Sequence, residues 1–491
     1  MGKYNLGLVR VMNILLLRPA PGNERFGLGP FFRIEPLGME YVAAALEMRG
    51  HHVTIRDLRF SPPLPSLLTD LRPEVVGISC MHALEIDDVL DVVAGVRKVR
   101  LGALIVVGGH SASAYPAPFF EDGVDAICLD DGERAVPALV DAAAGGRPLD
   151  QVPGWLLRQG STWQRTHDPE RPFELDEVPL PARQLVSGWR HRYACFHHRP
   201  AYLIETARGC PFRCSFCSVW QLFDRSVRER SIGAVCQDFE TTGDQVFIAD
   251  DLFWHHPSRS RALADELVGK RLRKDWLLVQ TRVDVVARHP ELLEAWRPVA
   301  REFDIFFGLE AATDAGLANL SKDTTVDRTA AALEVAREFG YGITGNFVID
   351  PDWTEADFER LWAFVETHQL SRAGFTILTP LPGTAYYEAS RPLIRAVRWS
   401  QFDMHHLLWE PRLGVERFFE LYCETWRRSV LNLKGKKKLW HWLAQAKPRH
   451  WMHLLQVLHR TQRMLQPSHY VRDHVLLPEP LERCETRTLA S

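Results

Sequence analysis

The sequence predicts an α/β protein with three parts: an N-terminal open, doubly wound Rossmann-like domain, a partial (β/α)6 TIM-like barrel, and a mainly helical C-terminal region. Three observations predict it. Apolar strand-like runs alternate with helical patterns before residue 145, the alternation resumes after residue 200, and the chain becomes helical and aromatic-rich from about Pro392. Because 491 residues exceed what one core usually organises, we expect several domains. We divide the chain into residues 1–145, 146–200, 201–391 and 392–491.

The first domain contains five strand-like runs, separated by helical patterns such as residues 36–49 and 87–99. Strands that alternate with helices predict a parallel sheet covered on both faces. In such a sheet, ligands bind beyond the carboxyl ends of the strands. Glycine, proline and acidic residues follow several of these runs. The runs are residues 13–18, 53–58, 75–80, 104–107 and 126–130.

Residues 146–200 are irregular and rich in proline and charge, so we interpret them as a linker. The stretch is long for a simple loop, and we expect part of it to pack between the domains.

Six further strand-like runs follow, and each of the first five precedes a helical pattern. Six such units predict an incomplete barrel, in which the chemistry gathers at the carboxyl ends of the strands. The runs are residues 202–206, 246–250, 277–281, 305–309, 344–349 and 375–379.

The strongest motif is a cysteine loop directly after the first barrel strand, with Cys210, Cys214 and Cys217 spaced C-x3-C-x2-C. Three thiolates from one loop can hold three irons of a 4Fe-4S cluster and leave the fourth open to a substrate. Zinc is the alternative, but it normally takes a fourth protein ligand, and no Cys or His stands nearby at a suitable spacing. We interpret the other cysteines as incidental thiols: Cys80, Cys128, Cys195, Cys236, Cys423 and Cys484.

This loop resembles the signature of the radical S-adenosylmethionine superfamily, including the aromatic Phe216 before the third cysteine. Residues 247–253 resemble the family's acidic second-strand motif, residues 308–310 with Lys322 its fourth-strand motif, and residues 380–384 its closing turn. Residues 350–352 depart from the glycine-rich turn that relatives often carry, and an Asp pair at a strand end can also be a helix cap. The resemblance implies S-adenosylmethionine contacts at Phe216, Asp250, Asp251, Arg282, Glu310 and Lys322.

The N-terminal domain resembles the cobalamin-binding domain of one large subgroup of this superfamily. Glycines at strand ends let the backbone approach a large flat ligand. The D-x-H-x-x-G motif that places a histidine on cobalt is absent, so we do not expect His110 to be an axial ligand. A flavodoxin-like regulatory domain or a cobalamin sensor is the alternative. The implied cobalamin contacts are Pro21, Gly22, Gly108, Gly109, His110, Asp131, Gly132 and Glu133.

The resemblance implies methylation of an unactivated carbon, which has no lone pair and therefore needs radical chemistry supplied by cofactors. The reduced cluster would cleave S-adenosylmethionine to a radical that removes hydrogen, and methylcobalamin would deliver the methyl group. We expect no catalytic side chain beyond the cluster ligands, and an electron donor such as ferredoxin or flavodoxin.

Residues 31–38 and 350–358, together with the length of the chain, resemble hopanoid C-3 methylases. This resemblance runs from about Met12 to Tyr470 and implies a hopanoid lipid as substrate. The alternatives are a methylase or oxidative cyclase for another scaffold, such as a porphyrin ester or an antibiotic precursor. A methylthiotransferase is disfavoured, because its N-terminal cysteines are missing.

The C-terminal region is strongly basic, with eleven Lys or Arg and no Asp or Glu between Thr425 and Arg472. Basic residues interleaved with Trp and Leu favour a peripheral contact with anionic lipid. The alternative is a packed helix pair with a solvated basic face. We expect no nucleic-acid partner, because the net charge is -3 and no RNA-binding module is recognised.

The sequence also indicates where the protein works. No apolar run approaches the roughly 20 residues of a membrane span, and the short apolar run at Met12 is followed by no signal-peptide cleavage site. We therefore expect a cytoplasmic protein that docks peripherally on the inner membrane face.

Overall fold

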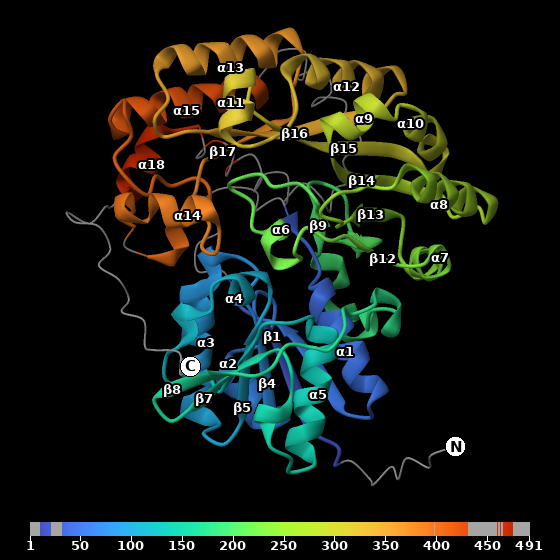
Figure 1. The fold of residues 1–491 in the computed structure, drawn as a ribbon, viewed down its shortest axis with the longest axis vertical. Helices are drawn as coiled ribbons and strands as arrows, with labels where there is room; N and C mark the ends of the chain where they lie inside the picture. Colours follow the sequence, from blue (N-terminus) through green and yellow to red (C-terminus); the bar gives the residue numbers. More distant parts are fainter. Residues whose placement is uncertain are drawn as a thin grey trace.

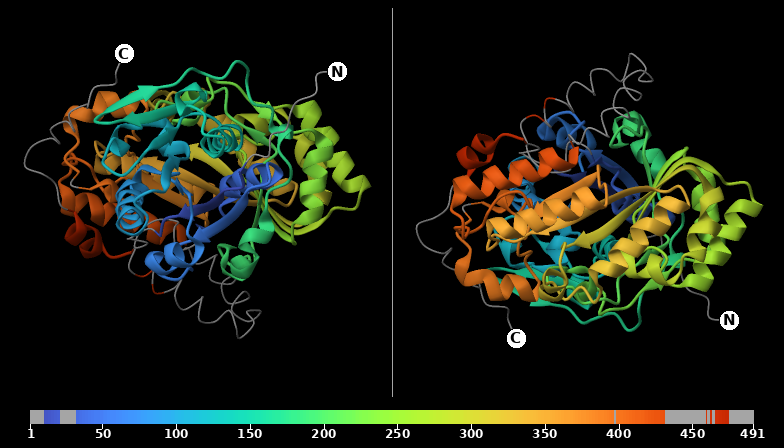
Figure 2. Two further views of the ribbon diagram at one scale, coloured as in Figure 1. Left: turned by 90° about the horizontal axis from the view of Figure 1, so that it is seen from below. Right: turned by 90° about the horizontal axis from the view of Figure 1, so that it is seen from above.

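The computed structural model describes residues 10–20, 32–396, 398–430, 459, 462 and 465–474. The chain forms two α/β layers, with the N-terminal sheet below the barrel and helix α6 (Val219–Leu222) between them in Figure 1. The two views of Figure 2, from below and from above, show the helices of both layers around their sheets. The predicted α/β class and the order of its three parts are confirmed.

The N-terminal sheet has seven strands in the order β3-β1-β4-β5-β6-β7-β8. The first five strands in this order are parallel to one another, and each corresponds to a predicted strand. Their bounds are β1 Asn13–Arg18, β3 His52–Asp57, β4 Val75–Ser79, β5 Leu104–Gly108 and β6 Ala126–Cys128.

Both faces of this sheet are buried under helices, as the apolar runs predict. Leu15 and Leu17 of β1 pack into one core, and Ile14 and Leu16 pack into the other, because successive side chains of a strand point to opposite faces. Helices α1 and α5 lie together, as do α2 and α3. The helices are α1 Leu37–Met48, α2 Leu64–Leu71, α3 Ile86–Val99, α4 His110–Ala114 and α5 Gly132–Ala144.

The segment that the sequence predicts to be an irregular linker contributes two strands to this sheet. Strands β7 (Trp155–Gln159) and β8 (Thr162–Arg165) pair antiparallel, and β7 pairs antiparallel with β6. The Gly160-Ser161 pair between them is a two-residue hairpin turn. Part of the same segment reaches back to the start of the chain, since β9 (Ala194–Cys195) pairs with β2 (Phe32–Arg33).

The barrel sheet has six strands in chain order, β10-β13-β14-β15-β16-β17, and all neighbours are parallel. This confirms the six predicted strands and the partial barrel. The strands are β10 Tyr202–Ile204, β13 Gln245–Ile248, β14 Lys274–Arg282, β15 Ala300–Glu310, β16 Gly342–Ile349 and β17 Ala373–Ile377.

Helices cover the outside of the barrel sheet. They are α7 Ile232–Thr241, α8 Pro257–Gly269, α9 Val283–Arg288, α10 Glu291–Trp296, α11 Asp314–Asn319, α12 Val326–Glu338 and α13 Glu355–Thr367. Short 3-10 helices occupy Ala83–Glu85, Ala117–Phe119, Leu149–Gln151, Leu175–Glu177, Arg183–Arg192, Arg297–Val299, Arg391–Leu393 and Trp399–Gln401.

The two faces of the barrel strands differ in burial. In β17, Phe375 and Ile377 are fully buried under helices, whereas the alternate residues Gly374 and Thr376 are partly exposed. Strand β16 alternates in the same way at Asn346. On these two strands the inner face is therefore less buried than the outer face, whereas on β14 the inward Trp276 and Leu278 are buried in a small cluster with Cys195 and Ala201.

The described C-terminal helices close the side of the barrel next to β17. They are α14 Ala385–Ser390, α15 Val415–Val430 and α18 Pro467–Asp473. Tyr422 of α15 donates a hydrogen bond to the carbonyl of Phe375 at 2.8 Å, and its neighbour Thr425 accepts one from Trp362 Nε1 of α13 at 2.8 Å. Most of the basic stretch after Val430 lies outside the described residues. Among the described helices, none is long and apolar enough to cross a membrane.

Candidate functional site

The cysteine loop leaves strand β10 through β11 (Ala207–Arg208), which pairs with β12 (Arg228–Glu229). Gly209 opens the loop at φ +102°, and a Cβ there would lie 2.2 Å from the carbonyl oxygen of Ser226. Only glycine fits this combination of backbone angle and close approach. Asp251 Oδ2 accepts a hydrogen bond from the Gly209 N–H at 2.8 Å, so the end of β13 holds the start of the loop.

The three predicted ligands follow within this loop. Cys214 is buried, and Cys210 and Cys217 are partly exposed. Burial raises the pKa of the Cys217 thiol to about 12, and iron binding replaces the thiol proton. Trp220 Nε1 donates to the Cys214 carbonyl at 3.0 Å, which fixes the middle of the loop. One anchored loop with three thiols, which the described residues complement with no fourth cysteine, fits a cluster with one open iron. In the described part of the chain, no three His, Cys, Asp or Glu side chains gather as a site for a single metal ion.

Arg282, at the carboxyl end of β14, contacts this loop. Its guanidinium lies 3.7 Å from the centre of the Phe212 ring, and Nη1 is 3.6 Å from Cys214 Sγ. Asp284 Oδ1 accepts a hydrogen bond from Arg282 Nε at 2.7 Å. The side chain predicted to contact S-adenosylmethionine is thus tied to the cysteine loop.

The adjacent carboxylates Asp250 and Asp251 are both engaged with backbone groups. Asp250 accepts hydrogen bonds from the N–H and the hydroxyl of Thr206, and it is buried. Burial raises the pKa of Asp250 to about 7 and that of Asp251 to about 6. Asp250 therefore joins β13 to the end of β10, and Asp251 holds Gly209 in the cysteine loop.

Glu310 and Lys322 form a buried ion pair at the end of β15, with 2.6 Å between Lys322 Nζ and Glu310 Oε1. Glu310 lies at a strand irregularity with φ +60°, and both neighbours of Lys322, Ser321 and Asp323, also have positive φ. Left-handed backbone at residues other than glycine is costly and concentrates at ligand sites. A Cβ at Gly308 would lie 2.7 Å from Lys322 Nζ, so glycine leaves the room that this pair occupies.

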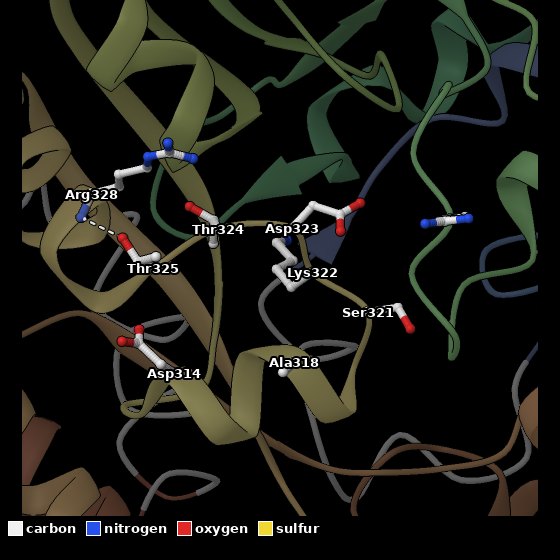
Figure 3. Close-up of a pocket in the computed structure, with 9 residues that line it drawn as sticks. Asp314, Ala318, Ser321, Lys322, Asp323, Thr324, Thr325 and Arg328 are labelled. Atoms are coloured by element: carbon white, nitrogen blue, oxygen red, sulfur yellow. Dashed lines mark hydrogen bonds between the residues drawn. The ribbon is translucent and has the colours of Figure 1, made fainter.

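Beside this pair is a cavity of about 430 Å³, formed between the cysteine loop and the segment that joins α11 to α12. Figure 3 shows its polar lining, with Thr325 and Arg328 at the start of α12 and Lys322 and Asp323 in the segment before it. Arg213, which lies between the first two cysteines, lines it as well. The lining brings the cysteine loop and the fourth-strand motif together, although more than 100 residues separate them.

The inner wall of the barrel also carries polar residues that the sequence reading missed. Asn346 Nδ2 donates to Thr376 Oγ1 across β16 and β17 at 2.7 Å, and both residues are partly exposed. Apolar Phe247, Phe306 and Val348 share the inward face and are partly exposed as well. The period of two along the strands could have identified these positions.

The glycines at the edge of the N-terminal sheet have a packing role. Gly109 has φ +106°, and a Cβ there would lie 2.6 Å from the Cys80 carbonyl oxygen. His110 begins α4, and its Nε2 lies 2.7 Å from the hydroxyl of Ser218, directly after the third cysteine. Burial lowers the pKa of His110 to about 4, so the ring is neutral. The structure thus joins this edge to the cysteine loop. Pro21 and Gly22 lie outside the described residues.

The acidic turn that begins α5 is bound to the barrel. Arg208 Nη1 donates to Asp131 at 2.6 Å, and Arg208 Nη2 donates to Glu133 at 2.7 Å. Arg228 Nη1 donates to the other Asp131 oxygen at 2.6 Å. A Cβ at Gly132 would meet Val42 of α1 at 3.1 Å. The residues predicted as cobalamin contacts therefore hold the carboxyl edge of the first sheet against the mouth of the barrel.

The closing turn after β17 completes this junction. Thr384 Oγ1 caps α14 by accepting from Tyr387 N at 3.0 Å, and the Tyr387 ring lies 5.5 Å from that of Tyr115, at the end of α4. The carboxyl edges of the two sheets thus face each other. A Rossmann-like edge that faces a partial barrel with an open-site cysteine loop defines the class of cobalamin-binding radical S-adenosylmethionine enzymes.

Comparison with known proteins agrees with this class. Residues 31–140 match the B12 binding domain, and residues 204–365 match the Radical SAM superfamily. The hopanoid C-3 methylase of Methylococcus capsulatus is 30% identical over 403 residues, which cover 80% of this chain and 76% of that protein. The chain belongs to the family of cobalamin-dependent radical S-adenosylmethionine methyltransferases.

Two solved structures share the fold. The cobalamin-dependent S-adenosylmethionine radical enzyme OxsB with aqua-cobalamin and S-adenosylmethionine bound has a TM-score of 0.68 and 18% identity, over 93% of this chain and 72% of that chain. The radical S-adenosylmethionine methyltransferase TsrM from Kitasatospora setae has a TM-score of 0.61 and 18% identity, over 79% and 80% of the two chains. The expected cofactors are confirmed: a 4Fe-4S cluster, S-adenosylmethionine and cobalamin.

Proposed function

We propose that this protein methylates C-3 of a hopanoid lipid. The observation that supports this substrate assignment is the 30% identity to the hopanoid C-3 methylase over 80% of this chain. The partly exposed Phe247, Phe306 and Val348 on the inner wall of the barrel support an apolar substrate. When bound, the cofactors supply a hydrogen-abstracting radical and a transferable methyl group.

In this proposal the protein binds and orients the cofactors and the substrate, and it excludes water from them. Cys210, Cys214 and Cys217 hold the cluster. Glu310 and Lys322 are well placed to meet the polar groups of S-adenosylmethionine, because their pair borders the cavity beside the cysteine loop. Phe216, which directly precedes Cys217, is proposed to act close to that site, and the carboxylates of Asp250 and Asp251 act through the backbone that they hold.

The cobalamin contacts are proposed at the edge of the first sheet, at Gly108, Gly109 and His110 and around the turn at Asp131, Gly132 and Glu133. Because His110 Nε2 is engaged with Ser218, we propose that His110 orients this edge and does not bind cobalt. The electron that the cluster needs would come from a ferredoxin or flavodoxin.

The proposed substrate is tested by lipid analysis of a bacterial host that makes unmethylated hopanoids, with and without this gene. We expect 3-methylhopanoids only with the gene, and no product from a variant with all three loop cysteines changed to Ala. Feeding methyl-labelled methionine should place the label on C-3. If the hopanoids stay unmethylated and the label appears on another scaffold, the hopanoid assignment is wrong. The methyltransferase class would still hold.

We also propose peripheral docking on anionic membranes through the basic stretch between Thr425 and Arg472. Each Lys or Arg near an anionic surface contributes about 1 kcal/mol, and a hopanoid is found in the bilayer. The protein should sediment with anionic liposomes at low salt and be released by salt. Charge reversal at Lys436, Lys437 and Lys438 should weaken sedimentation. Liposome binding that is unchanged by salt and by these three substitutions would contradict the docking proposal.

A further inference from the structure

The side chain of Arg282 is held from three directions. Its Nε donates to Asp284 Oδ1 at 2.7 Å, its Nη2 donates to the backbone carbonyl of Lys322, and its plane lies over the Phe212 ring. Only 6% of the side chain is exposed. These contacts leave Nη1 at 3.6 Å from Cys214 Sγ, within reach of a hydrogen bond to sulfur.

The negative charge that faces this guanidinium is shared with a second arginine. Among the described residues its ion-pair partner is Asp284, and Asp284 Oδ2 also accepts a hydrogen bond from Arg288. Two guanidinium groups therefore share one carboxylate, and the group nearer the sulfur is the buried one. A fixed cation in a poorly solvated site acts on neighbouring charges far more strongly than one in water.

We propose that Arg282 tunes the cluster by donating an N–H···S hydrogen bond to the Cys214 thiolate and by placing a positive charge beside it. One-electron reduction takes the cluster from the 2+ to the 1+ state, with no bond made or broken, and the electron comes from an external low-potential donor. The reduced form carries more negative charge, so the cation and the hydrogen bond stabilise it and raise the reduction potential. Arg282 is then a positioning residue of the cluster, beyond the S-adenosylmethionine contact that the sequence predicts.

Besides its effect on the reduction potential, Arg282 also fixes the geometry of the site through the same contacts. Lys322, whose carbonyl it binds, pairs with Glu310, and Cys214 lies at the centre of the cysteine loop. Arg282 thus connects the loop that binds the cluster to the segment that we propose for S-adenosylmethionine. Lysine has one nitrogen and lacks the planar fork, so it cannot make all of these contacts together.

The test compares Arg282→Gln and Arg282→Lys with wild type and with Arg225→Gln. Arg225 is the matched control, because its Nε donates to the Pro211 carbonyl of the cysteine loop at 3.1 Å, and it carries the same charge and is exposed to solvent. Each protein is reconstituted anaerobically, its iron and sulfide are measured, and the cluster is titrated with a chemical reductant at controlled potentials. Electron-spin spectra of the reduced cluster are recorded without and with S-adenosylmethionine.

We expect the Arg282→Gln protein to load iron and to show a roughly ten-fold lower ratio of reduced to oxidised cluster at a given potential, which is about 59 mV for one electron. Arg282→Lys should lie between this variant and wild type. Arg225→Gln should stay within about two-fold of wild type, because solvent screens an exposed charge.

Two outcomes would overturn the proposal. One is a native potential in Arg282→Gln with loss of the spectral change caused by S-adenosylmethionine, which makes Arg282 a contact of that ligand alone. The other applies if Arg282→Gln fails to hold iron: because lysine keeps the charge and loses the planar fork, a native potential in Arg282→Lys would then contradict the proposed N–H···S hydrogen bond. Neither outcome depends on the identity of the methylated substrate.

Discussion

The two strand edges that face each other in this protein look alike in sequence and differ in what their residues do. At the mouth of the barrel, Glu310 and Lys322 form a buried pair in strained backbone beside an open cavity. At the edge of the N-terminal sheet, Gly109 packs on Cys80, and Asp131 is bound by two arginines of the barrel. Glycines and acids after strands therefore border a cavity on one edge and join the two domains on the other.

The difference follows from what each edge must satisfy. The mouth of the barrel borders an open cavity, so polar groups at its strand ends can meet a ligand directly. The first sheet has to be held at a fixed position against that mouth, and buried ion pairs specify such a position, since breaking one leaves an uncompensated charge. Three predictions test this division of roles.

The largest effect is expected at Lys322. Changing it to Met leaves the Glu310 carboxylate buried and unpaired, which costs about 3–5 kcal/mol in comparable pairs. Urea denaturation should show a destabilised barrel, and binding of S-adenosylmethionine should weaken. The double variant with Glu310→Gln is the control and should recover much of the stability but not the binding. Recovery of both would show that the pair is structural only.

Much of the fold could be predicted because both sheets are parallel and buried by helices, so each strand is a continuous apolar run. Strands β7 and β8 were missed because prolines surround them, although buried Trp155 and Trp163 flank a Gly-Ser hairpin turn. The cysteine loop could be read directly, since its three ligands lie within eight consecutive residues.

The partners of individual side chains could not be predicted. Arg208 and Asp131 are 77 positions apart, and Arg282 and Cys214 are 68 apart. Nothing local in the sequence indicates that an acidic turn meets an arginine from another domain. The Asn346–Thr376 pair was also missed, because functional residues were expected at the carboxyl ends of the strands and these two residues lie inside them.

A moderate effect is expected at the domain junction. Asp131→Asn and Arg208→Gln should each destabilise the cobalamin-free protein, and a double-mutant cycle should give a coupling of about 0.5–3 kcal/mol between them. The measurement is urea denaturation without cobalamin, followed by cobalamin binding. If Asp131 and Arg208 show no coupling without cobalamin, and Asp131→Asn alone weakens cobalamin binding, the turn serves the ligand alone. The two edges would then not differ in role.

The smallest effect concerns His110, at the contact between the two edges. Burial is the main cause of its lowered pKa of about 4, and the neighbouring His82 adds to it, so folding favours the neutral ring. The unfolded chain binds a proton near pH 6.5 and the folded protein does not, so this contribution to stability is present above pH 6.5 and is lost as the pH falls toward 4. Between pH 8 and pH 6 the loss should be about 1 kcal/mol. The His110→Asn variant keeps a polar side chain facing Ser218 and should lose less stability over that interval when denatured in urea. Equal losses in the two proteins would mean that His110 is accessible to solvent and protonates freely, and the neutral hydrogen bond to Ser218 would then not hold the first sheet to the cysteine loop.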